Sequence, residues 1–211
     1  MKKKILISTG GSGGHVIPAM ALYDHLKNNF EIFLCTDERG SKFINKDKYK
    51  YEVISAPRLS TNLFRLPLTI INLVIAVVKS IFFLKNNKID TLLGTGGYMS
   101  VPFCLASKIL NIKIYLFEPN IIIGKANKFL LKLSSKIFCY SKEIIDYPSR
   151  EESKKIIIEH VLRKEIYDFK AGYNKKEDNN ITLLIIGGSQ GAKFFDDSLK
   201  NSIIDLSKKY K

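Results

Sequence analysis

Three glycine-rich segments, each between a short β-branched run and a longer helical pattern, restrict this chain more than any other feature. They span residues 9–15, 94–98 and 187–192. Short strands that alternate with helices are typical of βα units on a parallel sheet. Such α/β folds bind ligands at the carboxyl ends of their strands, where these glycines lie. The sequence therefore predicts a parallel-sheet α/β fold with a ligand site at that edge.

The pattern of apolar residues predicts individual elements along the first three quarters of the chain. We expect strands near residues 4–8, 31–36, 51–54, 91–94, 113–117, 136–140 and 155–158, and helices near 17–28, 68–84, 99–110 and 124–133. Pro18 is expected in the first turn of its helix, where a missing N–H costs nothing.

The last quarter begins with the polar stretch 174–180, which is typical of a surface loop or linker. A strand at 181–186, the third glycine segment and a helix to about residue 209 follow. One βα unit cannot cover both faces of its own sheet. We therefore expect a first domain at residues 1–163, and residues 164–211 as the start of a second domain that is incomplete here.

Composition adds weaker constraints. The 34 basic and 20 acidic residues give a net charge of +14, which favours an anionic partner such as nucleic acid, a phosphorylated substrate or an acidic membrane. The lysines accompany an Ile- and Asn-rich background, so charge alone carries little weight. Cys35, Cys104 and Cys139 lack metal-type spacing and suit a reducing compartment. The apolar run after the basic start ends at once in the first glycine segment, which argues against secretion.

The spacing of the first glycine segment excludes two common nucleotide-binding motifs. Thr9–His15 matches neither the dinucleotide pattern G-x-G-x-x-G nor the P-loop pattern G-x-x-x-x-G-K-[ST]. Glycines here let the backbone approach a ligand, and free amides at a helix start favour an anion. Any one segment could also be only a tight βα turn.

Together the motifs resemble those of the MurG-type glycosyltransferases. Residues 9–19, 93–102 and 187–193 resemble the three glycine loops of that family. The segment Phe117-Glu118-Pro119-Asn120, with Gly124, Asn127 and Lys128, resembles its H-E-Q-N segment and the helix after it. Four motifs occur in the family's order over nearly the whole chain.

The resemblance implies a GT-B fold, with two Rossmann-like domains facing each other across a cleft. It implies that N-acetylglucosamine is moved from UDP-N-acetylglucosamine to undecaprenyl-diphosphate-linked muramyl pentapeptide, with inversion and without an obligate metal or other cofactor. It also implies a peripheral location on the cytoplasmic face of the bacterial inner membrane, and no nucleic acid partner.

Two residues are candidates for the base that an inverting transfer requires. His15 ends the first glycine loop, and an imidazole titrates near neutral pH. Glu118 matches the acidic residue of the family segment, although a loop or helix-capping carboxylate is an equally good interpretation. Which of the two takes the proton stays open. His25 and His160 receive no role.

The resemblance also implies binding residues. Donor contacts fall on Ser12, Gly13, Asn120, Arg163, Ser189 and Gln190, and contacts to the acceptor and its diphosphate on Gly10, Gly11, Gly14, Gly96, Gly97 and Tyr98. The chain departs from the family at Phe117 and Pro119, where polar residues are expected, and at residues 160–162 before Arg163. These departures leave acceptor recognition and the arginine's role open.

Residues 68–84 form a strongly apolar run with Lys79 inside it and Arg58, Arg65, Lys85 and Lys88 around it. A spanning helix prefers ~20 apolar residues without an internal charge. The run therefore favours a helix that packs on the sheet and also lies on an anionic membrane surface.

Three functional hypotheses remain at this point. The chain is the first portion of a working transferase, a binding module for acceptor and membrane that a separate donor-domain chain completes, or an inactive fragment.

Overall fold

The computed structural model describes residues 2–54, 66–168 and 192–209. They belong to two units, Met1–Lys170 and Ala171–Lys211. The first unit contains strands β1 (Lys4–Ser8), β2 (Glu31–Thr36), β3 (Glu52–Val53), β4 (Thr91–Gly94), β5 (Lys113–Glu118), β6 (Lys136–Cys139) and β7 (Lys155–Ile157). Its helices are α1 (Gly13–Leu26), α2 (Leu66–Asn86), α3 (Ser100–Ile109), α4 (Lys125–Leu130) and α5 (Lys164–Asp168), with 3-10 turns η1 (Gly40–Phe43), η2 (Leu131–Leu133) and η3 (Ser149–Lys154).

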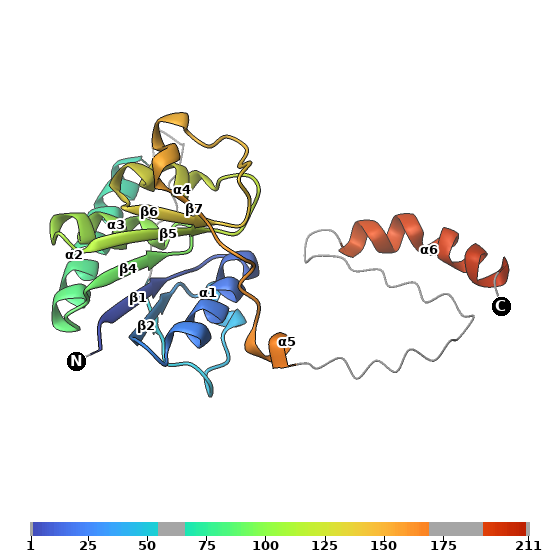
Figure 1. The fold of residues 1–211 in the computed structure, drawn as a ribbon, viewed down its shortest axis with the longest axis horizontal. Helices are drawn as coiled ribbons and strands as arrows, with labels where there is room; N and C mark the ends of the chain where they lie inside the picture. The colour runs from blue at the N-terminus through green and yellow to red at the C-terminus, as the bar shows by residue number, and fades with distance from the viewer. Residues whose placement is uncertain (1, 55–65, 169–191, 210–211) are drawn as a thin grey trace. The chain divides into compact units, whose positions relative to one another are not determined.

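The seven strands expected in this unit are confirmed, and they form one parallel sheet in the order β3-β2-β1-β4-β5-β6-β7 (Figure 1). In the second unit, α6 (Ala192–Lys209) lies within the expected helix. The strand expected at 181–186 and the linker expected at 174–180 lie outside the described residues.

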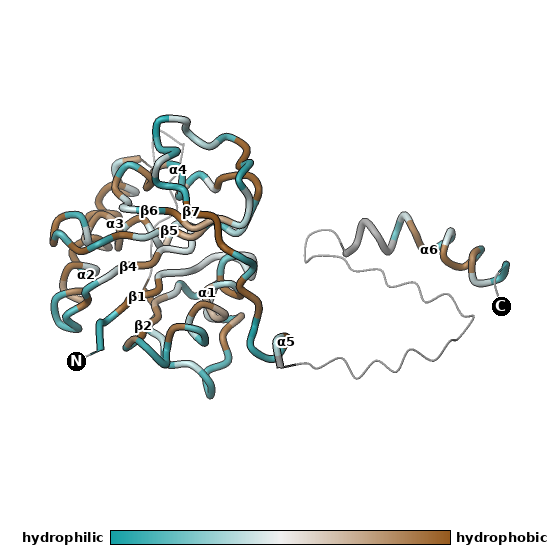
Figure 2. The backbone as a smooth tube through the Cα atoms, in the orientation of Figure 1, coloured by the Kyte–Doolittle hydropathy of each residue, from teal (hydrophilic) through white to brown (hydrophobic). Residues whose placement is uncertain are grey.

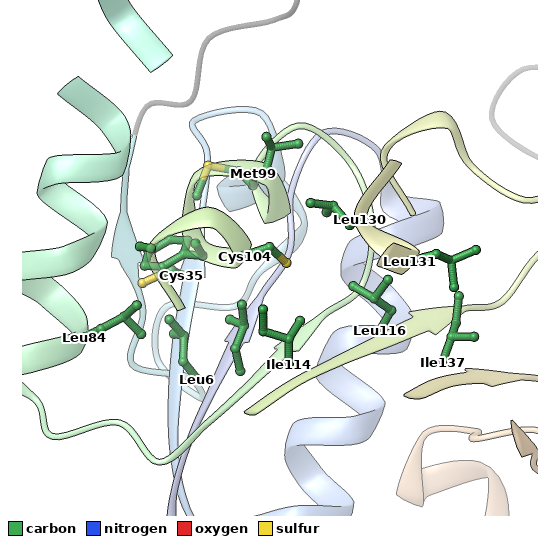
Figure 3. Packing of buried hydrophobic residues seen from close by; sticks show 14 of the residues in the cluster. Leu6, Cys35, Leu84, Met99, Cys104, Ile114, Leu116, Leu130, Leu131 and Ile137 are labelled. Atoms are coloured by element: carbon green, nitrogen blue, oxygen red, sulfur yellow. The ribbon is translucent and has the colours of Figure 1, made fainter. Parts of the chain in front are cut away.

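Both faces of the sheet are packed, because successive side chains of a buried strand point in opposite directions. On β5, Ile114 and Leu116 face the helices α2, α3 and α4, while Phe117 faces α1. Figure 3 shows the first of these two cores, in which strand side chains such as Leu6, Ile114 and Ile137 meet helical residues such as Leu84, Cys104 and Leu130. Two independent apolar layers thus hold the carboxyl edge of the sheet rigidly in place.

The start of α1 differs from the prediction. The helix begins at Gly13, with Ser12 as its extended N-cap residue, so Pro18 lies inside the helix and not in its first turn. The carbonyl of Ser12 accepts the amides of His15 at 3.1 Å and Val16 at 3.3 Å. Glycines usually predict a turn, but here two of them form the first helical turn. This brings His15 onto the helix and fixes its direction.

Helix α2 packs beside α3 with an unusual orientation of its side chains. Its buried residues include the small or polar Thr69, Ala76 and Ser80. Phe83 and Leu84, near its end, are also buried. Eight other large apolar residues are 43–61% exposed: Leu66, Leu68, Ile70, Ile71, Val74, Ile75, Val78 and Phe82. Figure 2 shows the hydrophobic character along this helix. The expected helix is confirmed, and most of its apolar surface does not serve the core.

Helix α2 is long and apolar enough to cross a membrane by length and composition alone. The topology argues against a span, because α2 connects β3 to β4 and both strands belong to one sheet. A spanning helix would leave those strands on opposite sides of a bilayer. Arg58 and Arg65, expected to flank this helix, lie outside the described residues.

The segment after β7 is held against the domain by two histidines that the sequence left without a role. The ring of His160 stacks on Tyr140 with 4.3 Å between centroids. The Nε2 atom of His25 lies 2.9 Å from the carbonyl oxygen of Leu162. Tyr167 on α5 donates its hydroxyl to the carbonyl of His160 at 2.9 Å. These contacts fix the chain where it leaves the sheet.

Candidate functional site

The first two glycine loops meet at the point where the strand order reverses. From β1 the chain passes through α1 to β2 on one side, whereas from β4 it passes through α3 to β5 on the other. Connections that diverge in this way leave a crevice at the carboxyl ends of the two central strands. The loop after β1 and the loop after β4 line that crevice, as the sequence predicted for a ligand site.

The two loops touch through their backbones. Gly97 has a φ of +75°, a backbone conformation that residues other than glycine rarely adopt. A Cβ placed on it would lie 3.1 Å from the carbonyl oxygen of Gly10. A Cβ on Gly10 would lie 2.7 Å from Cγ of Met99. Glycine is therefore required at this contact for space as well as for conformation.

A cavity of about 220 Å³ opens between these loops. Eight residues line it: Gly10, Gly11, Ser12, His15, Asp37, Arg39, Gly97 and Tyr98. Six of the residues proposed from the sequence are therefore brought together. Asp37 and Arg39 were missed, although both follow β2, and residues at the ends of neighbouring parallel strands share one edge of a sheet.

His15 is oriented by the second loop. Its Nδ1 atom lies 2.9 Å from the carbonyl oxygen of Thr95. Because a carbonyl only accepts, Nδ1 must carry the proton, and Nε2 of the neutral ring is left as a proton acceptor. The side chain is half-buried and lines the cavity. This geometry is what a general base needs.

Glu118 is placed differently. Its side chain is completely buried, and each carboxylate oxygen accepts two hydrogen bonds. The donors are the amide and side chain of Asn120, the amide of Gly124 at 2.8 Å and the side chain of Asn127 at 3.0 Å. A carboxylate saturated in this way holds the loop between β5 and α4. The geometry favours the loop interpretation of Glu118 over proton transfer.

Asn127 connects this loop to the second glycine loop. Its Nδ2 atom also donates to the carbonyl of Phe117 at 3.1 Å, and a Cβ on Gly96 would lie 3.3 Å from the same nitrogen and 3.1 Å from His15. The buried carboxylate of Glu118 thus supports the region beside His15 through one intermediate side chain.

Other candidate residues lie elsewhere. Arg163 lines a separate cavity of about 190 Å³ beside α1, together with Phe43, Lys48 and Glu165 among others. Gly13 lies next to the ring of Phe43, and Gly14 does not line the glycine-loop cavity. Ser189 and Gln190 lie outside the described residues. The first unit therefore does not gather the donor-contact set in one place.

The cysteines have no chemical role in this arrangement. All three are buried free thiols. Burial, with a smaller contribution from the charge of Glu118, raises the pKa of Cys139 to about 11. Burial also raises the pKa values of Cys35 and Cys104. Thiols held protonated in this way are poor nucleophiles and act as small core side chains.

Comparison with protein-family models gives a match at residues 5–139 to the glycosyltransferase family 28 N-terminal domain. A relative from Pelagibacter ubique, a UDP-N-acetylglucosamine–N-acetylmuramyl-(pentapeptide) pyrophosphoryl-undecaprenol N-acetylglucosamine transferase, is 54% identical over 211 residues, which are 100% of this chain and 59% of that protein. A relative of the same name from Rickettsia canadensis is 35% identical over 98% of this chain and 58% of its own length. The chain thus spans about three fifths of the curated relatives it matches.

Solved structures support the fold. The crystal structure of Acinetobacter baumannii MurG matches 95% of this chain and 54% of its own with a TM-score of 0.71 and 22% identity. A UDP complex of S. aureus MnaA matches 74% of this chain and 44% of its own with a TM-score of 0.55 and 15% identity. The GT-B type of α/β architecture expected from the sequence is confirmed for this part of the fold.

Proposed function

Because this chain belongs to glycosyltransferase family 28, whose N-terminal domain it carries, we propose that it forms the acceptor-binding half of an inverting N-acetylglucosaminyltransferase. The donor is UDP-N-acetylglucosamine, and the acceptor is undecaprenyl-diphosphate-linked N-acetylmuramyl pentapeptide. The names of the relatives support this choice of substrates. The observation that carries the proposal is the orientation of His15: the carbonyl of Thr95 holds its ring at the cavity between the two glycine loops.

In the proposed reaction, Nε2 of His15 takes the proton from the acceptor sugar hydroxyl as its oxygen attacks the anomeric carbon of the donor. A carbon–oxygen bond to the acceptor forms, the bond from that carbon to the diphosphate breaks, and UDP leaves with its electron pair. The hydrogen bond from Nδ1 to Thr95 holds the imidazole in the tautomer that can accept this proton. Glu118 acts as a positioning residue for the loop beside it.

The remaining assignments follow from the resemblance. Residues 1–163 form the acceptor and membrane domain, and residues 164–211 begin a domain that binds the UDP-sugar. Donor contacts come from Ser12, Gly13, Asn120, Arg163, Ser189 and Gln190. Acceptor and diphosphate contacts come from Gly10, Gly11, Gly14, Gly96, Gly97 and Tyr98.

We further propose that α2 holds the protein on the cytoplasmic face of the bacterial inner membrane. Its exposed apolar residues form a surface that water does not favour. Lys79, Lys85 and Lys88 are exposed on or just after the helix, and basic side chains attract anionic lipid headgroups. A lipid-linked acceptor would be met at this surface.

The function can be tested with a fusion of residues 1–211 to the part of the Pelagibacter ubique relative that this chain does not cover. The measurement is transfer of radiolabelled N-acetylglucosamine to a short-chain lipid-linked muramyl pentapeptide. We expect transfer, and we expect His15→Ala to lower its rate by about 10²- to 10⁴-fold, the usual contribution of a general base. Asn28→Ala, at an exposed position just after α1 and outside the cavity, serves as the control.

The outcomes separate the three hypotheses. Transfer by the fusion, and loss of transfer with His15→Ala only, supports a working acceptor half. An inactive fusion whose 211-residue part still binds the lipid acceptor supports a binding module that uses another donor partner. Neither transfer nor acceptor binding would overturn the proposal in favour of an inactive fragment.

A further inference from the structure

The corner that follows β2, residues 37–40, is hydrogen-bonded to the first glycine loop. Oδ1 of Asp37 accepts the backbone amide of Gly11 at 2.9 Å and that of Gly40 at 2.7 Å. A Cβ placed on Gly40 would lie 3.1 Å from Cα of Gly10 and would also meet the side chain of Thr36. The corner and the glycine loop are therefore in backbone contact, and one carboxylate oxygen joins them.

This contact changes the electrostatics expected for the cavity. The amide of Gly11, at a φ of +82°, was expected to face an anionic ligand, but it donates to Asp37 instead. Asp37 also brings a negative charge to the cavity lining. A cavity that binds phosphate groups here needs a compensating positive charge, since one loop amide is engaged and a carboxylate is near.

Arg39 supplies that charge. It is the one lysine or arginine among the eight residues that line the cavity. Its side chain is exposed, and among the described residues it makes no ion pair or hydrogen bond. It lies two residues after Asp37 and directly before Gly40, so the fixed corner sets where its backbone lies relative to the glycine loop.

We propose that Arg39 binds the diphosphate of the lipid-linked acceptor, and that Asp37 positions both Arg39 and the tip of the first glycine loop. This inference rests on the proposed function and adds two residues to its acceptor site. A guanidinium presents a planar set of donors that matches phosphate oxygens in pairs, and its charge is permanent. The alternative source of the same chemistry is the diphosphate of the donor, which the test distinguishes.

The experiment measures binding of farnesyl diphosphate to the full 211-residue chain by calorimetry at fixed low salt, with farnesol and uridine diphosphate in parallel. We expect wild type to prefer farnesyl diphosphate to farnesol. We expect Arg39→Ala to weaken the binding of farnesyl diphosphate at least tenfold and the binding of farnesol less than twofold. Arg39→Lys keeps the charge without the planar donor set, so we expect an intermediate loss. Lys42→Ala is the matched control, because Lys42 is also exposed in the same turn but does not line the cavity.

Asp37 is tested by rescue. Asp37→Asn keeps an oxygen that can accept the amides of Gly11 and Gly40, so we expect it to retain the preference for the diphosphate. Asp37→Ala removes that oxygen and should lower the preference at least fivefold. Circular dichroism checks that each variant is folded. A purely structural role would lower the melting temperature without changing the ratio of diphosphate to farnesol affinity in the folded protein.

Each outcome has a separate meaning. If wild type does not prefer farnesyl diphosphate to farnesol, the proposed acceptor site itself is wrong. If wild type shows the preference and Arg39→Ala retains it, or if Lys42→Ala weakens it equally, the assignment of Arg39 is overturned. If Arg39→Ala weakens only the binding of uridine diphosphate, the arginine binds the diphosphate of the donor, and its assignment to the acceptor is wrong.

Discussion

Helices α1 and α2 pack on opposite faces of one sheet, and both bury polar side chains, but they do so for different reasons. In α1 the buried polar residue is Asp24, whose carboxylate accepts hydrogen bonds from Lys27, Lys48 and Tyr49. No large apolar side chain of α1 is exposed within the described part of the chain. In α2 the buried polar residues are short hydroxyl side chains, and eight large apolar ones are exposed.

The difference shows that the two helices are shaped by different surroundings. The composition of α1 is explained within the domain, since its apolar residues meet the sheet and its carboxylate meets matched donors. The composition of α2 is not explained within the described domain. Small buried side chains let α2 pack beside α3, and its exposed large apolar side chains form the surface for which we propose contact with a membrane. Substitutions on the two helices should therefore affect different measurements.

The largest effect is expected for Val74→Glu combined with Val78→Glu, one helical turn apart on the exposed side of α2. Each valine buried in lipid contributes roughly 1.5–3 kcal/mol to the free energy of membrane binding, and a carboxylate is repelled by anionic headgroups. We expect affinity for phosphatidylglycerol-containing vesicles to fall at least about 100-fold, or about 2.7 kcal/mol. The unfolding free energy should change by less than about 0.5 kcal/mol, because both sites are exposed. Vesicle sedimentation and urea unfolding provide the two readings.

Asn28→Glu combined with Asn29→Glu is the control for charge, since both residues are exposed just after α1. This pair makes the same change in net charge in the loop after α1, away from α2. An equal loss of vesicle binding in this control would show that charge alone governs binding, and the contrast between the two helices would then have no functional meaning.

The next effect is expected for Asp24→Ala. The variant leaves the buried hydroxyl of Tyr49 without its acceptor, which costs about 1–3 kcal/mol. Lys27 and Lys48 are near 40% exposed and recover water contacts, so they add little. We expect a loss of about 2 kcal/mol in urea unfolding. Tyr49→Phe removes the same bond from the other side, so the double variant should lose less than the two single losses added together. If the two losses of unfolding free energy were strictly additive, Asp24 and Tyr49 would not be coupled by the hydrogen bond described here.

Acidification should reduce the effect of Asp24→Ala. Burial raises the pKa of Asp24, but hydrogen bonds from Lys27, Tyr49 and Lys48 outweigh burial and hold the pKa below its usual value. A carboxyl group with a depressed folded pKa contributes stability above its unfolded pKa, about 3.9, and loses it as the pH falls through the folded pKa. The difference between wild type and variant should thus be constant from pH 7 to 5 and shrink below about pH 4. A difference that grows on acidification would have the wrong sign.

Much of the fold could be predicted from the sequence because its strands are short, apolar and separated by glycine turns. The boundaries of β1, β2 and β4 agree with the prediction to the residue. The start of α1 was misplaced, since glycines that usually form turns are here the first residues of a helix. The inward side of α2 was not predictable from hydropathy either, because apolar residues surround the whole helix and give no period to follow.

The candidate site was predictable only where its residues belong to a motif that is continuous in the sequence. Loops that continue β1 and β4 contain glycine motifs and were found. Asp37 and Arg39 have no motif, and they join the cavity only because β2 lies beside β1 in the sheet. Glu118 could not be assigned from sequence, since its four hydrogen bonds come from two residues of the next loop and from Asn127 on α4. Strand order and loop closure are the missing information in both cases.

The smallest effect is expected for Ser80→Ala, the counterpart on α2 of Asp24→Ala. Ser80 is fully buried, but its hydroxyl donates to the carbonyl of Ala76 at 2.8 Å within the same helix. That carbonyl keeps its helical backbone partner, and alanine is the better helix former, so we expect a change within about 0.5 kcal/mol. Ser80→Leu should instead cost about 1–3 kcal/mol, because it forces bulk into a close contact. If Ser80→Ala were as costly as Asp24→Ala, the buried side of α2 would depend on polar contacts beyond its own helix. Small size would then no longer explain why this side of α2 faces inward.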